Sequence, residues 1–92
     1  MRRLVLALAL IPAAAFAQSA TERATATVLP MIQEIQPGDA GVILTGCIIG
    51  AASSDEIATL AAAPGPSAEI GGLINGILTR PAVMQCLQAA AN

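Results

Sequence analysis

The sequence predicts an all-α fold, a small bundle of four to five short helices stapled by one disulfide. Three observations support this prediction. Serines precede acidic residues at the spacing of helix N-terminal capping boxes. Apolar residues recur three and four positions apart, which places them on one face of a helix. Two cysteines lie far apart in the chain, where a disulfide would link distant helices.

Residues 1–17 have the three-part pattern of a cleavable secretory signal peptide. Two arginines follow the first methionine, an apolar stretch extends from Leu4 to Ile11, and the small residues Ala15 and Ala17 form an A-x-A cleavage site. The apolar stretch is shorter than the roughly 18 residues of a membrane-spanning helix. We therefore expect cleavage near Ala17 and a periplasmic or secreted protein. A retained N-terminal anchor is the alternative.

Residues 18–92 are expected to form a single small helical domain. They contain two arginines, six carboxylates and no lysine or histidine, which gives a net charge of −4. Phosphate backbones and anionic lipid headgroups repel such a surface, so nucleic acid is not an expected partner. No integral membrane span is expected after signal cleavage. The sole aromatic residue, Phe16, lies in the signal peptide, so the domain lacks the aromatic anchors of strong protein interfaces.

Cys47 and Cys86 are expected to form a structural disulfide, because an even number of cysteines in an exported chain indicates pairing. A redox-active pair is the alternative. Catalytic dithiols usually lie two residues apart beside a basic group, and these two cysteines are distant from each other. Closing a loop of roughly 40 residues stabilises a domain by about 4 kcal/mol in the chain-entropy model. A domain this small needs such a staple.

The first helix of the domain is expected to begin at a capping box formed by Ser19 and Glu22. Pro30 interrupts the apolar pattern, either as a kink or as the start of a second helix. We therefore predict that the firmer helix covers Pro30–Ile35. A Gln-Pro-Gly turn follows, and Asp39 is placed to cap the next helix.

The run from Val42 to Ile49 is apolar on every side, so it fits either a buried helix or a buried strand. Its β-branched residues favour a strand. Its neighbours have helical patterns, however, and no second strand is visible to pair with it. We therefore predict a helix over Ala40–Gly50, the central and most buried helix of the bundle.

Three further helices have clear start signals. Ser53 and Glu56 form a second capping box, Ser67 caps a helix with Glu69 in its first turn, and Pro81 occupies the first turn of the last helix. The predicted apolar faces are Ile57, Leu60 and Ala61 in the first; Ile70, Leu73, Ile74, Ile77 and Leu78 in the second; and Val83, Cys86, Leu87 and Ala90 in the third. The last face is expected to point its cysteine inward, toward the other one.

No group of side chains predicts an enzyme, a cofactor site or a metal site. Asp55 and Glu56 are adjacent on a helix and do not face a common point; their charges instead favour the helix dipole. Without histidine, and with the thiols oxidised, the chain offers no metal-ligand set. Arg80 is expected to be a helix-end charge rather than an anion-binding group. Capping roles, not nucleophilic ones, are expected for the serines Ser53, Ser54 and Ser67.

Two G-x-x-x-G spacings join Gly46 to Gly50 and Gly72 to Gly76. Glycines at this spacing let two helix backbones approach closely. We interpret them as close packing inside the domain or at a dimer interface. A membrane-active segment over residues 70–78 is the alternative, although it lacks the tryptophan and lysine that anchor interfacial helices.

The residues together predict a non-catalytic exported helical protein that binds a protein partner. Its role would be that of an accessory subunit, an inhibitor or a chaperone-like factor. A carrier or binder of an apolar ligand and a membrane-active protein are the alternatives. A weak homodimer is compatible with each of them.

Overall fold

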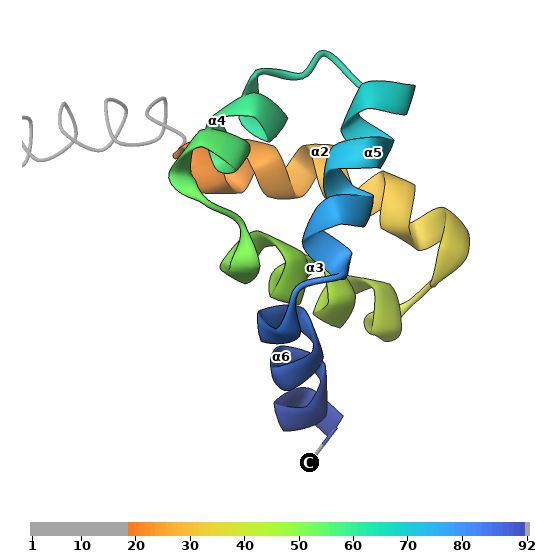
Figure 1. The fold of residues 1–92 in the computed structure, drawn as a ribbon. Helices are drawn as coiled ribbons and strands as arrows, with labels where there is room; N and C mark the ends of the chain where they lie inside the picture. Colours follow the sequence, from red (N-terminus) through yellow and green to blue (C-terminus); the bar gives the residue numbers. More distant parts are fainter. Residues whose placement is uncertain (1–18, 92) are drawn as a thin grey trace, which may run out of the picture.

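The computed structural model describes residues 19–91, and all regular structure in this range is α-helical. The predicted signal peptide and its cleavage site lie outside the described residues. The helices of the range are α2 (Ala20–Ile35), α3 (Asp39–Ala51), α4 (Ser54–Ala62), α5 (Ala68–Leu78) and α6 (Pro81–Ala91) (Figure 1). The predicted all-α fold is confirmed, and the ambiguous apolar run is helical. None of the described helices is long and apolar enough to cross a membrane.

Serine caps begin three helices where the sequence predicts them. Ser19 and Ser53 each accept a hydrogen bond from the backbone N–H three residues further on. Glu22 and Glu56 complete the capping boxes by accepting from the backbone N–H of these serines. Ser67 accepts a bond of 3.1 Å at the start of α5. Each cap satisfies a backbone donor that has no partner within the helix and contributes about 1 kcal/mol.

The helix α2 continues through Pro30 as one helix of 16 residues, so of the two alternatives the start of a second helix at Pro30 is excluded, and the helix extends well before the predicted Pro30–Ile35. Pro30 is exposed, and so is Ala26, whose carbonyl loses its helical partner and can bind water instead. The opposite face packs into the core and carries the buried residues of the helix, Ala24, Val28 and Ile32. Burial of this face outweighs the local cost of the proline, because tertiary packing provides most of a helix's stability.

The turn between α2 and α3 is held by Gln33 and requires a glycine. Gly38 has a φ of 76°, which favours glycine, and it is the N-cap residue of α3. The prediction that Asp39 is the cap is therefore wrong; Asp39 is the first residue of the helix, where its charge favours the dipole. The Gln33 side-chain oxygen accepts from the Gly38 N–H at 2.8 Å, and its nitrogen donates to the Gly38 carbonyl at 3.2 Å.

The central helix is α3, which contacts α2, α5 and α6, but it is not buried on all sides. Val42 and Ile43 are 53% and 43% exposed. Helix α3 nevertheless has more buried residues than any other described helix, so the expectation of the most buried helix is confirmed, although the other described helices leave this side uncovered. The side of α3 that faces the core carries Gly41, Thr45, Cys47 and Ile48.

The core draws side chains from every described helix. Its buried hydrophobic residues are Ala24, Val28, Ile32, Cys47, Ile48, Leu60, Ile70, Ile74, Ile77 and Val83. Thr45 is also buried, and its hydroxyl has no hydrogen-bond partner among the described residues. Helix α6 projects from the body with the C-terminus at its far end (Figure 1) and buries only Val83. The packing of α6 onto the core is therefore confined to its first turns.

Candidate functional site

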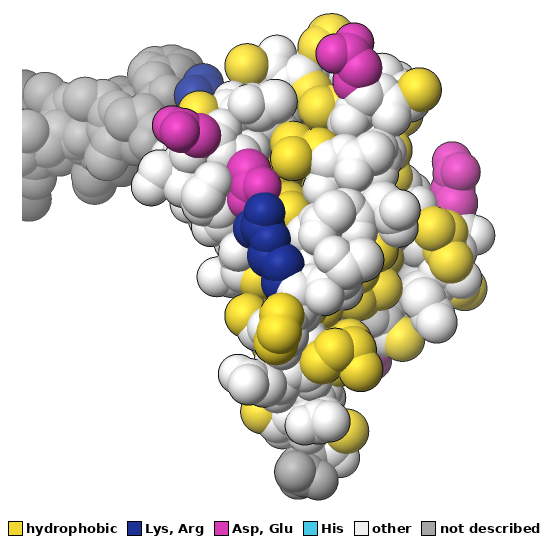
Figure 2. All heavy atoms as spheres, in the orientation of Figure 1, with side chains coloured by type: hydrophobic (Ala, Val, Ile, Leu, Met, Phe, Trp, Pro, Cys, Tyr) yellow, Lys and Arg dark blue, Asp and Glu magenta, His cyan; other side chains and the backbone are white. Residues whose placement is uncertain are grey.

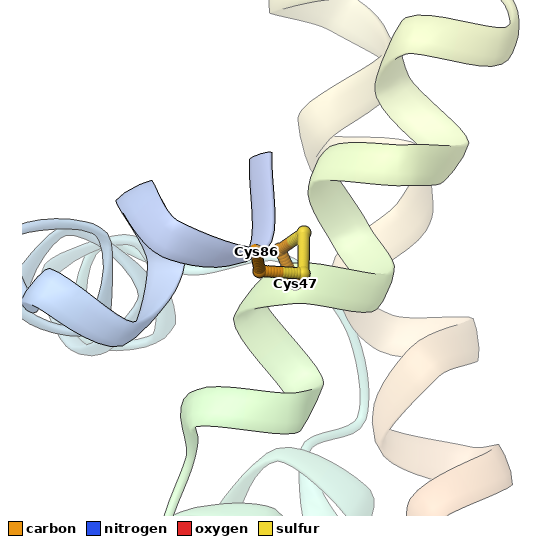
Figure 3. Close-up of a disulfide and its surroundings, with 2 residues drawn as sticks. All are labelled: Cys47 and Cys86. Atoms are coloured by element: carbon orange, nitrogen blue, oxygen red, sulfur yellow. A yellow bond between two sulfur atoms is a disulfide. The ribbon is translucent and has the colours of Figure 1, made fainter. Parts of the chain in front are cut away.

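A disulfide joins Cys47 of α3 to Cys86 of α6, with a Cα–Cα distance of 5.6 Å and a sequence separation of 39 (Figure 3). Cys47 is 3% exposed and belongs to the core. Cys86 points toward Cys47, as expected from its helix face, but it is exposed rather than buried. The reason is that α6 extends past the body, so that Leu87 is half-buried and Ala90 is exposed. The disulfide links the core to a helix that has little apolar packing of its own.

Arg80 lies in the connection between α5 and α6 and links this connection to α3 and α4. Its Nη1 donates to the Oε1 of Glu56 at 2.7 Å and to the carbonyl of Ala51 at 3.0 Å. Its Nη2 donates to the Oε2 of Glu56 at 2.5 Å. Both residues lie at helix ends, as the sequence predicts, but the contact between them was missed. The only signal for it is that Arg80 is the single cation in the second half of the sequence.

This ion pair lowers the pKa of Glu56 from 4.5 to about 2. The hydrogen bonds from Arg80 contribute most to the change, the backbone hydrogen bond from Ser53 adds to it, and burial opposes it. A carboxylate whose pKa is lowered by folding stabilises the native state above its unfolded pKa. The contribution of Glu56 is therefore fully present above pH 4.5 and is lost as the pH falls toward about 2.

The substitution Glu56→Gln is expected to lower the thermal midpoint near neutral pH and to flatten its dependence on pH between about 5 and about 2. Glutamine preserves the capping box but removes the charge that pairs with Arg80. Melting curves across this pH range provide the measurement. Glu22→Gln is the matched control, because Glu22 has the same capping position in α2 and forms no ion pair among the described residues. Superimposable pH profiles for wild type and Glu56→Gln would contradict the expected coupling.

A groove of about 520 Å³ lies between the C-terminal half of α2 and α5. Its apolar lining includes the buried side chains of Ile32 and Ile74. Ile35 stands at its edge and is 75% exposed. Glu34 is the one charged residue of the lining. We call this groove between α2 and α5 the α2–α5 groove. Figure 2 shows one face of the molecule, on which hydrophobic side chains are exposed between few charged groups.

A second hollow of about 620 Å³ lies where α4 ends and α5 begins. Its lining includes Ser67 and Glu69, which belong to the polar first turn of α5. Ser67 is already engaged as the cap of that helix. The two hollows are similar in polarity, because Glu34 and Asn75 line the α2–α5 groove. The α2–α5 groove is the better candidate for binding an elongated apolar partner, since it lies between two helices, whereas the second hollow includes the loop residues Ala63 and Pro64.

The two glycine pairs do not pack closely inside the domain. A Cβ atom placed at Gly46, Gly50, Gly72 or Gly76 would meet nothing within 4 Å. The interpretation as internal packing is therefore wrong, and the dimer interface remains a hypothesis. Gly72 lines the α2–α5 groove, where the absence of a side chain keeps the groove open.

The other predicted candidates serve as helix-end residues. Asp55 is exposed in the first turn of α4, and its carbonyl accepts a hydrogen bond from the Thr59 hydroxyl at 3.0 Å. Ser54 is the first residue of α4 rather than its cap, which corrects the capping role expected for it. Among residues 19–91, no group of three or more His, Cys, Asp or Glu side chains is placed to hold a metal ion.

The fold and these features define the class: a small all-α domain with one disulfide and an apolar surface groove. No family model, curated protein or solved structure matches this chain. Its function is therefore inferred from the groove, the distribution of charge and the disulfide.

Proposed function

We propose that this chain is an exported, non-catalytic helical protein that binds another protein as an accessory subunit, an inhibitor or a chaperone-like factor. The α2–α5 groove is the binding site, and its occupant is the apolar face of a cationic amphipathic helix of the partner. The observation that carries this proposal is the apolar groove itself, in a domain small enough to need most of its apolar surface for its own core.

The groove has the form that a helical segment requires. It lies between two helices, with Met31 and Ile32 on one wall and Ile74 and Leu78 on the other. A helix in such a groove inserts side chains at positions i, i+3 or i+4, and i+7. Gly72 is part of the α5 wall and contributes no side chain to the groove.

Charge favours a cationic partner over an anionic one. Glu34 is exposed and is the charged residue of the groove lining. Residues 19–91 contain six carboxylates against two arginines, and one of these arginines, Arg80, is already paired with Glu56. A lysine or arginine beside the partner's apolar face would therefore meet Glu34 and would be attracted by the domain as a whole.

An apolar small molecule is a less suitable occupant. A volume of about 520 Å³ is within the range of small-molecule pockets. A carrier, however, encloses most of the surface of its ligand. Here Ile35 is 75% exposed at the edge of the groove, and Gly72 and Asn75 are exposed as well. A ligand in this groove would remain in contact with water along one side.

The membrane-active alternative is weakened by the packing of α5. Its apolar residues Ile70, Ile74 and Ile77 are buried in the core. Insertion of this segment into a bilayer would require the domain to unfold, so the apolar appearance of the sequence is explained by the fold.

Export is part of the proposal, and it rests on the pattern of residues 1–17. The Cys47–Cys86 disulfide supports it, because disulfides persist in oxidising compartments such as the periplasm and the extracellular space. The mass of the protein recovered after export tests this part, with cleavage after Ala17 as the expected result. Recovery of uncleaved chain from the cytoplasm would overturn it.

Two synthetic peptides with the same apolar helix face test the groove, one with lysines and one with glutamates on its polar face. Binding to the oxidised protein is followed by chemical-shift changes in wild type, Gly72→Leu and Gly76→Leu. The two variants are matched, because both glycines lie in α5 and neither has an atom within 4 Å of an added Cβ. Only Gly72 lines the groove.

The expected result is that the lysine peptide binds wild type and Gly76→Leu, and that Gly72→Leu weakens binding at least tenfold, about 1.4 kcal/mol. The glutamate peptide is expected not to bind. Equal binding of both peptides, or full binding by Gly72→Leu, would overturn the proposal. Lipid that co-purifies with wild type but not with Gly72→Leu would overturn the protein-binding proposal and support the carrier of an apolar ligand instead.

A further inference from the structure

The side of α3 that turns away from the core is apolar and uncovered. We call this surface, formed by Val42, Ile43, Gly46 and Gly50, the outer face of α3. Val42 and Ile43 are 53% and 43% exposed, and both glycines are exposed. Residues three and four apart share one side of a helix, so these four form one continuous strip. The other described helices leave this strip open.

The fold itself gives no reason for the residues of this strip. Glycine in a helix interior costs about 1 kcal/mol relative to alanine. At Gly46 and Gly50 a methyl group would touch nothing within 4 Å, so internal packing does not require glycine there. Val42 and Ile43 are only about half covered, so much of their apolar surface is left in contact with water. A helix that packs against this strip would use both features, since the glycines permit close approach and the branched side chains add contact area.

The charge distribution favours a second copy of the chain as the occupant. From Ala40 to Ser54 the sequence contains no ionisable side chain other than Cys47, which is in the disulfide. Residues 19–91 contain six carboxylates and two arginines, so two copies repel each other through most of their surfaces. Asp39, exposed and three residues before Val42, lies at the N-terminal end of this side of α3. Beyond it, from Val42 to Gly50, the outer face of α3 carries no charge, and this repulsion is weakest there. A cationic partner, in contrast, is drawn to the surfaces that carry the carboxylates.

We propose that the outer face of α3 is the contact of a two-fold symmetric homodimer, in which two α3 helices cross at Gly46 and Gly50. In such an interface the same strip serves both protomers, so Val42 and Ile43 of each copy pack beside the glycines of the other. Helix α3 has 13 residues, a length of about 20 Å. One helix crossing of this length buries less than the roughly 1,200 Å² of stable interfaces. The dimer is accordingly weak and dependent on concentration.

Sedimentation velocity of the oxidised protein over a concentration series tests the proposal. Wild type is expected to shift from monomer toward dimer as its concentration increases. Gly46→Leu is expected to raise the dimer dissociation constant at least tenfold, because its side chain holds the two backbones apart. Gly76→Leu, the same change at an exposed and equally open helix position outside α3, is expected to behave as wild type.

Three results would overturn the homodimer: wild type that stays monomeric at millimolar concentration, Gly46→Leu that dimerises as wild type does, or loss of dimer in Gly76→Leu. If Gly46→Leu does not fold by circular dichroism, Val42→Glu replaces it, since it adds a negative charge at the contact of two acidic protomers and Val42 lies outside the core. The groove peptides give a separate readout. Gly46→Leu is expected to bind the lysine peptide normally, so failure of one proposal leaves the other standing.

Discussion

Replacing Cys47 and Cys86 together with alanine is expected to lower the free energy of unfolding by about 4 kcal/mol. The disulfide closes a loop over a sequence separation of 39, which removes conformational entropy from the unfolded chain. A domain of about 70 residues has a total stability of roughly 4–11 kcal/mol. The loss is therefore a third or more of the whole, and urea denaturation followed by circular dichroism should show it as a large fall in midpoint.

Reduction of wild type by a dithiol is the matched control, because it opens the disulfide and leaves every side chain in place. Helix α6 should respond first, since Val83 is its only buried residue. Hydrogen exchange of the backbone N–H groups of residues 84–91 is expected to speed up before that of α2. Equal urea midpoints for oxidised and fully reduced protein, with reduction verified by mass, would contradict the predicted role of the disulfide.

The substitution Gly41→Ala is expected to destabilise the fold by about 2–3 kcal/mol, although alanine is the better helix former. Gly41 is buried where α3 begins, and a Cβ there would overlap the carbonyl oxygen of Gln36 at the end of α2. The obstructing atom belongs to the backbone, so relief requires the two helices to separate. Urea denaturation of the variant measures the loss.

Gly46→Ala provides the control on the same helix and is expected to change stability in the opposite direction. A Cβ at Gly46 meets nothing within 4 Å, so alanine should stabilise α3 by up to about 1 kcal/mol through helix propensity. Both variants are measured at low concentration, so that the proposed homodimer does not contribute to the measured stability. Gly41→Ala with wild-type stability would show that the turn between α2 and α3 adapts, and that the close approach is not required.

Features that depend on neighbouring residues could be predicted from the sequence. Ser53 and Glu56 are three residues apart, and a capping box needs nothing beyond that spacing. The pattern of Ile70, Ile74 and Ile77 likewise identifies the buried side of α5 before any packing is known. The disulfide follows from there being only two cysteines in the chain.

The α2–α5 groove could not be predicted, because its walls come from segments about 40 residues apart that share no pattern. Ile35 of α2 and Gly72 of α5 line the same groove only because the fold places α5 beside α2. The contact of Arg80 with Glu56 has the same origin, since it joins residues 24 positions apart. The groove has no signal in the local sequence. The only signal for the ion pair is the scarcity of cations in the sequence.

By itself the sequence determined the helical class, the starts of α2, α4 and α5 and the pairing of the cysteines, because these depend on short-range spacing or on a single choice. Only the tertiary structure decided that Pro30 lies within a helix, that one face of α3 is uncovered and that Cys86 is exposed. The reason is that a residue's burial depends on which helices pack around it. Propensity and periodicity describe one helix at a time, and they leave open which side its neighbours will cover.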